Sequence, residues 1–485
     1  MPFAARTALL CALLASTLGA ARNDGNVAGV LQRMREVAGP VWRAHIVSVA
    51  RLSINGVPTV VSAETQGLRV LVRHCTGEVC DGTYFNGERL YSFNMNGTPV
   101  PEDREIEPFF RALRIASGLL FLGSPSEARG VRIVNGGTES LNSKPYRTLL
   151  IGGGDVVPLR VYVDPRNWLL RFVRTLDGRE TFEYVGYRRI GAFALPFEVL
   201  HNGRVLERYD DRAIVASALA APRGLVPSFN GAPESVATDP RAVTPIVECN
   251  VGGIAARCLI DSGNSGLSMS SEMASRLDAP VVGNFEVRGL GGYSTQVVRA
   301  GPLRIGNALF SEAYYIVLND LRRYGYDVVL GADVLATTNL EIDAAAHLVR
   351  LDAAPAPHAG IAVPLSFQNF VPVVTVDLGS VQTQLAVDTG DESNINLSYD
   401  FYAKHPGLFT ITQRRTVGGI GGSSVQMIGE IGQVRIGDYR LGPQRIGTTQ
   451  TLQGTAFGHL GAGFLNQFLV RLDYANGELR LLRRT

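Results

Sequence analysis

Two short motifs in the chain combine a carboxylate with a hydroxyl group and a glycine. Residues 261–263 read Asp-Ser-Gly, residues 388–390 read Asp-Thr-Gly, and each motif follows an apolar run that predicts a strand. Two carboxylates held close together share a proton, because like charges at short distance oppose a second ionisation. Such a pair supplies a base that activates water and an acid that protonates the substrate. The pattern therefore predicts hydrolysis by an activated water molecule, provided that the fold brings the motifs together.

The two motifs belong to an internal repeat. A hairpin pattern precedes each motif, and a glycine cluster follows each one, Gly-Leu-Gly-Gly-Tyr at 289–293 and Gly-Ile-Gly-Gly-Ser at 419–423. Further on, an apolar stretch leads to Gly331 in the first copy and to Gly461 in the second, at nearly equal distances from the two aspartates. Chance does not explain so long a match. The repeat predicts two similar structural units.

This order of motifs resembles the retropepsin-like aspartic peptidases, and its tandem form is similar to the pepsin-like enzymes. The resemblance covers about residues 241–485. It implies that each repeat forms one lobe and that Asp261 and Asp388 are the catalytic dyad. It also implies a peptide or protein substrate, and we expect an aspartic endopeptidase that acts as a monomer.

The same resemblance assigns supporting roles to the neighbouring residues. Gly263 and Gly390 let the backbone turn tightly beside the carboxylates, and the hydroxyls of Ser262 and Thr389 can hydrogen-bond across to the opposite loop. The two glycine clusters are candidate flap tips that cover the substrate, although a plain surface turn is the alternative. The candidate flap and substrate-binding residues are Gly291, Gly292, Tyr293, Gly421 and Gly422.

The second repeat departs from the family pattern at two places. Asp391 stands where the family usually has a small neutral residue, and His459 replaces an apolar residue before the second glycine motif. Asp391 either points towards the dyad, where it raises the upper pKa of the pair, or it faces solvent or caps a nearby turn. A lone histidine is more often structural than catalytic. An alternative function is therefore a catalytically inactive, exported peptide- or lipid-binding protein on the same fold.

The region before the repeat reads as a separate β-rich domain. Alternating apolar runs such as 68–72 and 159–163 predict strands, and the apolar spacing within 105–122 predicts one helix. We expect a curved antiparallel sheet that holds this helix. Residues 161–168 faintly resemble the LolA-like lipoprotein-carrier half-barrel, so a lipid or protein ligand of this domain is one possibility and a plain apolar core is the other.

The predicted fold is thus mainly β, with two retropepsin-like barrels after the N-terminal domain. A stretch rich in proline and glycine separates them and is interpreted as a linker. The predicted segments are a signal peptide at 1–21, the N-terminal domain at 22–219, a linker at 220–240, the first lobe at 241–354 and the second lobe at 355–485.

The N-terminus and the cysteines indicate export. A basic residue, a short apolar stretch and small residues at the expected cleavage point are typical of a secretory signal peptide, and the stretch is too short to span a bilayer. Four cysteines follow it and form two local pairs, Cys75 with Cys80 and Cys249 with Cys258. We expect two disulfides in a periplasmic or secreted protein. A metal site that includes His74 is the alternative for the first pair, although no second ligand cluster accompanies it.

The net charge and the absence of two common motifs argue against other classes of function. The formal net charge is only +2, and the basic residues are scattered, so no nucleic-acid surface is predicted. Neither His-Glu-x-x-His nor Gly-x-Ser-x-Gly occurs, so a zinc or serine hydrolase lacks its usual signature. We expect no cofactor and no metal.

Overall fold

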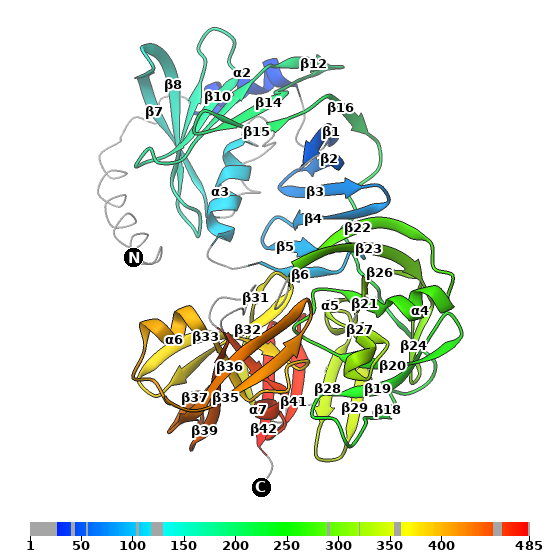
Figure 1. The fold of residues 1–485 in the computed structure, drawn as a ribbon. Helices are drawn as coiled ribbons and strands as arrows, with labels where there is room; N and C mark the ends of the chain where they lie inside the picture. The colour runs from blue at the N-terminus through cyan, green and yellow to red at the C-terminus, as the bar shows by residue number, and fades with distance from the viewer. Residues whose placement is uncertain are drawn as a thin grey trace. The chain divides into compact units, whose positions relative to one another are not determined.

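The structure, a computed structural model, is mainly β and consists of several antiparallel sheets with a few short helices (Figure 1). It divides into two compact units. The first comprises Met1–Cys75, Gly82–Tyr91 and Asp103–Ala221, and the second comprises Thr76–Asp81, Ser92–Glu102 and Pro222–Thr485. The described residues are 27–39, 44–54, 57–102, 106–117, 130–288, 292–319, 321–353, 360–449 and 458–483. The predicted signal peptide at 1–21 lies outside them.

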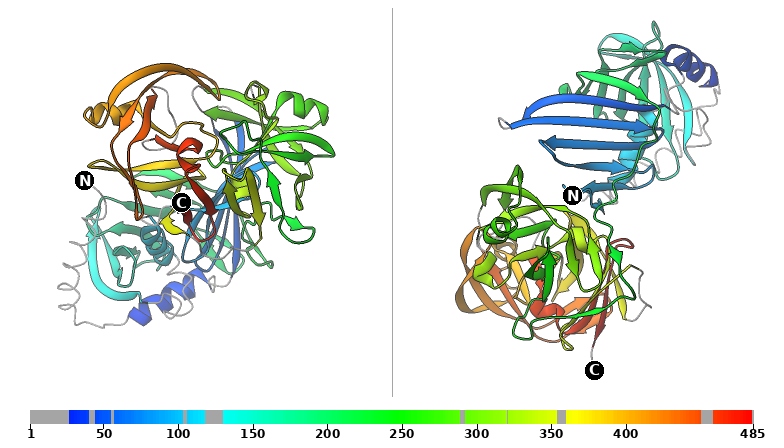
Figure 2. Two further views of the ribbon diagram at one scale, coloured as in Figure 1. Left: turned by 90° about the horizontal axis from the view of Figure 1, so that it is seen from below. Right: turned by 90° about the vertical axis from the view of Figure 1, so that its right-hand side faces the viewer.

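The first unit is built on two antiparallel sheets. One sheet has the order β16-β1-β2-β3-β4-β5-β6, where β6 is Pro99–Pro101, and its blue strands lie side by side in the right-hand view of Figure 2. The other has the order β15-β14-β11-β10-β9-β8-β7. The strands of the first sheet are β1 (His45–Ile54), β2 (Val57–Gln66), β3 (Arg69–Thr76), β4 (Val79–Phe85), β5 (Leu90–Phe93) and β16 (Asp211–Val215). Those of the second are β7 (Arg132–Leu141), β8 (Lys144–Gly152), β9 (Leu159–Val163), β10 (Leu170–Thr175), β11 (Thr181–Val185), β14 (Glu198–His201) and β15 (Arg204–Arg208), and a separate pair is β12 (Arg188–Ile190) with β13 (Phe193–Leu195).

Two helices pack on the second of these sheets. α3 (Glu107–Ser117) lies within the stretch where the sequence predicts a helix, and it buries Ile115. α2 (Val27–Ala38) was not predicted, and its buried Met34 joins the same core. Both helices present an apolar stripe at helical spacing, and the sheet contributes Val161 to the core between them.

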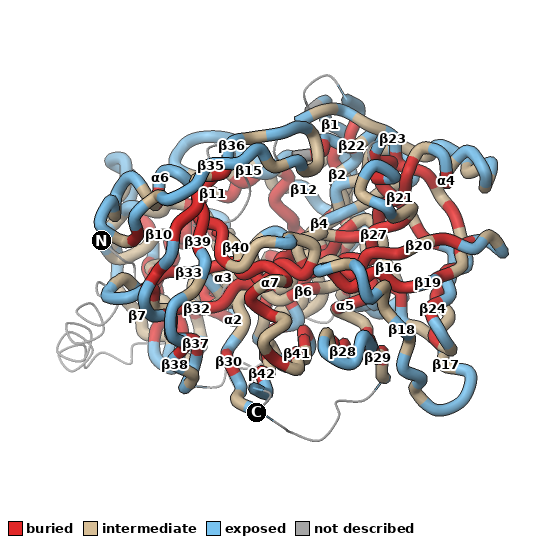
Figure 3. Tube along the Cα trace, turned by 60° about the horizontal axis from the view of Figure 1, so that its bottom comes forward, coloured by how far each residue is buried: buried red, intermediate tan, exposed pale blue. Residues whose placement is uncertain are grey.

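The second unit contains two ten-stranded sheets with the same order of equivalent strands. The first runs β17-β25-β24-β19-β20-β27-β21-β26-β23-β22, and the second runs β38-β37-β32-β33-β40-β34-β39-β36-β35, with β31 beside β32. The order of strands thus repeats as the sequence repeats. The tube is largely red, and therefore buried, along β20 and β27 in Figure 3.

The equivalent elements have similar lengths in the two repeats. The first repeat contains β17 (Ser228–Phe229), β19 (Ile246–Val251), β20 (Ile254–Ile260), β21 (Leu267–Ser270), α4 (Ser271–Arg276), β22 (Val281–Arg288), β23 (Gly292–Ala300), β24 (Leu303–Ile305), β25 (Ala308–Phe310), β26 (Ala313–Leu318), η4 (Leu321–Tyr324), β27 (Val328–Leu330) and α5 (Ala332–Leu335). The second contains β31 (Ser366–Gln368), β32 (Val371–Leu378), β33 (Val381–Asp388), β34 (Ile395–Ser398), α6 (Tyr399–Lys404), β35 (Thr410–Gly419), β36 (Gly422–Ile431), β37 (Val434–Ile436), β38 (Tyr439–Leu441), β39 (Gln444–Thr449), β40 (Gly458–Gly461) and α7 (Ala462–Leu465).

A six-stranded sheet joins the two repeats. Its order is β18-β29-β28-β41-β42-β30, and the central pair, β28 with β41, places Ile342 opposite Val470. Both side chains are buried in a core that draws on both repeats. The strands are β18 (Ser235–Ala237), β28 (Asn339–Asp343), β29 (Leu348–Asp352), β30 (Ile361–Pro364), β41 (Phe468–Asp473) and β42 (Glu478–Arg483).

The stretch predicted as a linker contributes to two of these sheets. Within residues 220–240, β17 pairs with β25 and β18 pairs with β29. Its prolines and glycines separate the two strands, each of which is only two or three residues long. Among the described residues, no helix is long and apolar enough to cross a membrane.

Residues 92–102, from the N-terminal half of the sequence, belong to the second unit and bind one buried carboxylate there. The side chains of Asn94, Asn96 and Thr98 donate hydrogen bonds of 2.8, 2.6 and 2.5 Å to Asp333. Asp333 lies in α5 and is fully buried. Burial raises the pKa of this carboxyl above its usual range, although the three hydrogen bonds oppose the effect.

We expect Asp333→Ala to lower the free energy of unfolding of the second unit by about 3 kcal/mol, because a buried donor left without an acceptor costs about 1–3 kcal/mol. Urea unfolding measures this change. Asp400→Ala, at an exposed position in the first turn of α6, is the control and should shift stability by less than about 0.5 kcal/mol. Equal unfolding midpoints for Asp333→Ala and the wild type would contradict the role given to this contact.

Candidate active site

The two motif aspartates lie at the ends of equivalent strands and face one another. Asp261 directly follows β20, and Asp388 is the last residue of β33. A Cβ atom added to Gly263 would lie 2.6 Å from Cγ of Asp388, and one added to Gly390 would lie 2.5 Å from Cγ of Asp261. Each carboxyl group therefore packs against the glycine of the opposite motif. The close approach is possible only because both positions lack a side chain.

A reciprocal hydrogen-bond network ties the two loops together. The hydroxyl of Ser262 donates to the carbonyl of Val387 (2.6 Å) and accepts from the backbone N–H of Thr389 (3.1 Å). The hydroxyl of Thr389 donates to the carbonyl of Ile260 (2.8 Å) and accepts from the N–H of Ser262 (3.0 Å). Both side chains are buried. The four bonds fix the separation of the loops and hence of the carboxyl groups that they carry.

Backbone groups hold the carboxyl groups in place. The N–H of Gly263 donates to Oδ1 of Asp261 at 2.8 Å. Oδ1 of Asp388 accepts from the N–H groups of Gly390 at 3.0 Å and Asp391 at 3.1 Å. Burial, and next the negative charge of Asp388, raise the pKa of Asp261 well above its usual range. Asp261 is thus suited to carry the proton of the pair.

His459 adds a third ionisable side chain to the site. It lies on β40, which runs parallel to β33 and places His459 beside Ala386, two residues before Asp388. Its Nδ1 is 2.9 Å from Oδ2 of Asp388 and 3.5 Å from Oδ2 of Asp391. Burial alone would lower the pKa of this imidazole, but the hydrogen bonds to the two carboxylates outweigh it and raise the pKa to about 10. His459 is therefore an imidazolium at neutral pH.

Asp391 combines the two orientations considered from the sequence. Its Oδ1 accepts the N–H of Ser393 at 2.8 Å, which caps the turn, and its Oδ2 faces His459. Burial would raise the pKa of Asp391, but the hydrogen bond from His459 and its positive charge lower the pKa below its usual range. The negative charge of Asp391 is thus balanced by His459 within the site.

One ligand atom each from Asp388, Asp391 and His459 lies within 4.8 Å of the others. This spacing alone could suit a metal ion. However, Nδ1 of His459 already lies at ion-pair distance from both carboxylates, and a protonated imidazole has no lone pair for a metal. We therefore interpret the three side chains as an ion-paired cluster.

The two candidate flap hairpins reach a common apolar cluster. Gly291 lies outside the described residues, whereas Gly292 is exposed at the start of β23 and Tyr293 is partly buried. In the other hairpin, β35–β36, the tip residue Ile420 packs on the same cluster as Tyr293. The Tyr324 hydroxyl donates to the carbonyl of Gly419 at 3.2 Å.

The cluster that Tyr293 and Ile420 contact belongs mostly to the first repeat. Its buried members are Val287, Ile316, Leu318, Leu321 and Val329. Gly421 and Gly422 follow Ile420 at the tip of the second hairpin, and the positive φ of Gly421 (83°) shapes the turn. The structure therefore brings Tyr293 of the first hairpin and Ile420 of the second to one apolar cluster.

A disulfide supports the strand that leads to Asp261. Cys249 on β19 and Cys258 on β20 are bonded, with Cα atoms 5.9 Å apart. Cys75 and Cys80 are also disulfide-bonded. The predicted disulfides are therefore confirmed, and the alternative metal site at the first pair is not needed to explain its cysteines.

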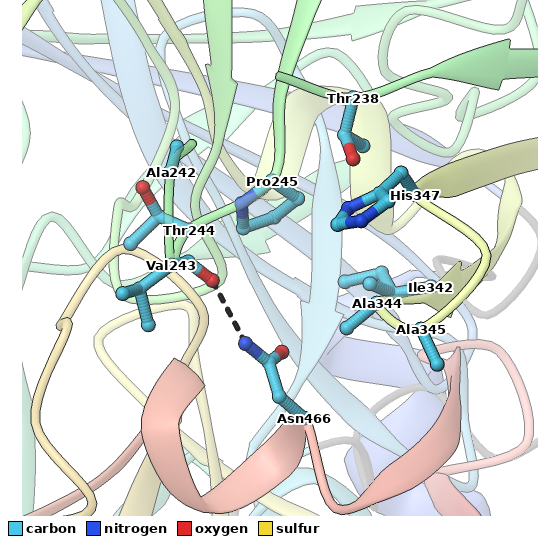
Figure 4. Close-up of a pocket in the computed structure, with 10 residues that line it drawn as sticks. All are labelled: Thr238, Ala242, Val243, Thr244, Pro245, Ile342, Ala344, Ala345, His347 and Asn466. Carbon is cyan, nitrogen blue, oxygen red and sulfur yellow. Dashed lines mark hydrogen bonds between the residues drawn. The ribbon is translucent and has the colours of Figure 1, made fainter. Parts of the chain in front are cut away.

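A small pocket of about 200 Å³ lies elsewhere in the second unit (Figure 4). Across it, the side-chain amide of Asn466 donates to the carbonyl of Val243 at 2.9 Å. None of the residues predicted to act in catalysis or substrate binding lines this pocket. The lining residues are Thr238, Ala242, Val243, Thr244, Pro245, Ile342, Ala344, Ala345, His347 and Asn466.

No protein-family model matches the sequence, and no curated protein matches it either. The chemistry assigned to the site therefore rests on its own residues. These residues form a close pair of carboxyl groups, one from each repeat, of which Asp388 is buried and Asp261 is partly buried. Hydrogen bonds fix the separation of the two loops, and the imidazolium of His459 lies beside Asp388.

Proposed function

We propose that this chain is an aspartic endopeptidase that hydrolyses peptide bonds with water activated between Asp261 and Asp388. The single observation that carries the proposal is the reciprocal arrangement of the two loops. Each carboxyl group packs on the glycine of the other motif, and the hydroxyls of Ser262 and Thr389 cross between them. This arrangement supplies the acid and the base that hydrolysis by water requires.

The reaction follows from sharing one proton between the two groups. The ionised carboxylate removes a proton from water while the water oxygen bonds to the peptide carbonyl carbon. The protonated carboxyl group gives its proton to the carbonyl oxygen, which yields a neutral tetrahedral diol. Return of the protons then breaks the C–N bond: the amine leaves with the proton taken from water, and one diol hydroxyl returns its proton to the dyad.

Other features of the chain support the proposal. The hairpins β22–β23 and β35–β36 are candidates to cover a bound peptide, because Tyr293 and Ile420 near their tips pack on one apolar cluster. Two disulfides suit an oxidising compartment, in keeping with an exported protein. Since both aspartates belong to one chain, we propose that the monomer is the active form.

The test is incubation of the purified protein with a diverse peptide library between pH 3 and pH 8, with products identified by mass spectrometry. We expect cleavage products from the wild type, none from Asp261→Asn, and no loss of activity when a metal chelator is added. Absence of products at every pH would favour the inactive binding protein instead. Equal cleavage by Asp261→Asn, or loss of activity with the chelator, would point to different chemistry.

A further inference from the structure

The two repeats differ at one position beside the dyad. His459 stands two residues before Gly461, and Val329 stands two residues before Gly331. Both lie on the strand that runs parallel to the aspartate-bearing strand, in the same register: Val329 is opposite Leu259, and His459 is opposite Ala386. The first repeat is therefore apolar where the second places an imidazole. The asymmetry concerns Asp388 and not Asp261.

The hydrogen bonds to the two aspartates are correspondingly unequal. Oδ1 of Asp388 accepts two backbone N–H groups, and Oδ2 faces Nδ1 of His459 at 2.9 Å. Asp261 accepts one backbone N–H, from Gly263. In the part of the chain that the structure describes, no Lys, Arg or His lies at ion-pair distance from Asp261. Hydrogen-bond donors and a cation beside Asp388 stabilise its ionised form more than the ionised form of Asp261 is stabilised.

The remaining groups around the imidazole are anionic or neutral. Asp391 faces it from the loop after β33, and the neutral Asn396 is its register partner on β34. Asp261 does not lie at ion-pair distance from His459, but the positive charge of His459 still acts to lower the pKa of Asp261. Burial raises the pKa values of Tyr326 and Tyr474, the phenols that interact with the dyad, so both are neutral in the working range. The negative charge of Glu392 also raises the pKa of Tyr326.

We propose that His459 is a positioning residue that, as an imidazolium, holds Asp388 ionised and in place, so that Asp388 is the base and Asp261 carries the shared proton. The inference rests on the proposed function and says which aspartate is the base and which is the acid. Asp388 takes the proton of the attacking water, and Asp261 protonates the carbonyl oxygen. The amine leaves with the proton held by Asp388. His459 keeps its proton throughout.

Chemical modification tests this assignment without requiring peptide hydrolysis. A small epoxide is attacked by an ionised carboxylate: the new C–O ester bond forms as the epoxide C–O bond breaks, and the alkoxide takes a proton from water. A diazoacetyl ester instead needs a protonated carboxyl group, which protonates the diazo carbon before the carboxylate displaces N₂. Peptide mapping should find the epoxide ester on Asp388 and the diazo-derived ester on Asp261.

Two variants separate the charge of His459 from its packing. His459→Val introduces the residue of the first repeat, and His459→Gln keeps a hydrogen-bond donor without a charge. In a correctly folded variant, the pH dependence of epoxide labelling at Asp388 should move upward by about one pH unit or more, on the scale of the loss of one neighbouring charge. Asp400→Asn, exposed on α6, should leave it unmoved. An unmoved profile in His459→Gln, or equal labelling of both aspartates in the wild type, overturns the proposal.

Unfolding provides a second readout that does not depend on activity. The pKa of His459 is about 10 in the folded protein and about 6.5 when unfolded, so its contribution to stability is fully present below pH 6.5 and is lost as the pH rises through 10. Between pH 7 and pH 10 the wild type should therefore lose more stability than His459→Gln. Equal losses of stability in the two proteins would contradict a charged His459.

The labelling experiment also separates this inference from the proposed function. If the epoxide labels Asp388 selectively but the protein cleaves no peptide, the proposed function is wrong, whereas the assignment of Asp388 as the ionised member of the pair still holds.

Discussion

Replacement of either Asp261 or Asp388 by Asn is expected to lower kcat/KM for peptide hydrolysis by about 10²- to 10⁴-fold or more, the range supported by general acid–base catalysis. Asn has nearly the shape of Asp, so the crossing hydroxyls of Ser262 and Thr389 should still hold the two loops together. What is lost is the exchangeable proton. Either remaining carboxyl group would lack the partner that acts as acid or base. The measurement is the initial rate on a peptide that the wild type cleaves.

Two controls define the interpretation. Asp400→Asn, at an exposed position on α6, should retain the wild-type rate. An equimolar mixture of the two inactive variants should stay inactive, because the structure places both aspartates in one chain. Activity regained on mixing would show that the site is assembled between chains. A folded single variant with full activity would remove that aspartate from the mechanism.

The second large effect is expected from the glycines that face the carboxyl groups. Gly263→Ala and Gly390→Ala should each lower kcat by about 10²-fold, a loss typical of misplacing catalytic groups by about 1 Å. The reason is steric. The new methyl group would lie 2.6 Å from Cγ of Asp388 or 2.5 Å from Cγ of Asp261, so the opposite carboxyl group must move.

Gly442→Ala is the matched control, because no atom lies within 4 Å of a Cβ added there and its φ is not positive. It should retain the wild-type kcat. Circular dichroism and thermal unfolding must show that the variants at 263 and 390 are folded before their rates are compared. Wild-type kcat in both of these folded variants would mean that the carboxyl groups are not held where the structure places them.

The central part of the site could be predicted because its signals are local in sequence. A strand followed by Asp-Ser/Thr-Gly gives a carboxylate, a hydroxyl and a flexible backbone within three residues, and the repeat of this pattern indicates a pair. The equivalent strand orders of the two ten-stranded sheets show the same repeat in the structure. The paired cysteines were likewise readable, because Cys249 and Cys258 flank a tight turn between adjacent strands.

The role of His459 was not predicted, although its position was noticed. The sequence shows a histidine where the first repeat has Val329, but the contact with Asp388 depends on β40 running parallel to β33. Residues 389–457 separate β33 from β40, so no local pattern in the sequence indicates that the two strands pair. A polar residue that interrupts one copy of an apolar repeat would have been the signal to follow.

The contact between Asp333 and residues 94–98 was also beyond prediction from the sequence. The partners are separated by more than 230 residues, and Asn96-Gly97 reads only as a turn. Asn94, Asn96 and Thr98 donate to Asp333 because a buried carboxyl group needs hydrogen-bond donors around it. Similarly, the short strands β17 and β18 pair with distant edges, which a stretch rich in proline and glycine does not reveal.

The most direct test of water activation by the dyad is a single-turnover cleavage in H₂¹⁸O with the protein in excess over a peptide that it cleaves. Direct attack by water predicts one ¹⁸O atom in the new carboxyl terminus of the product. It also predicts no ¹⁸O in the protein fragments that contain Asp261 and Asp388, and no covalent adduct on either. No cleavage, or ¹⁸O or a peptide adduct on one of these aspartates, would contradict the account.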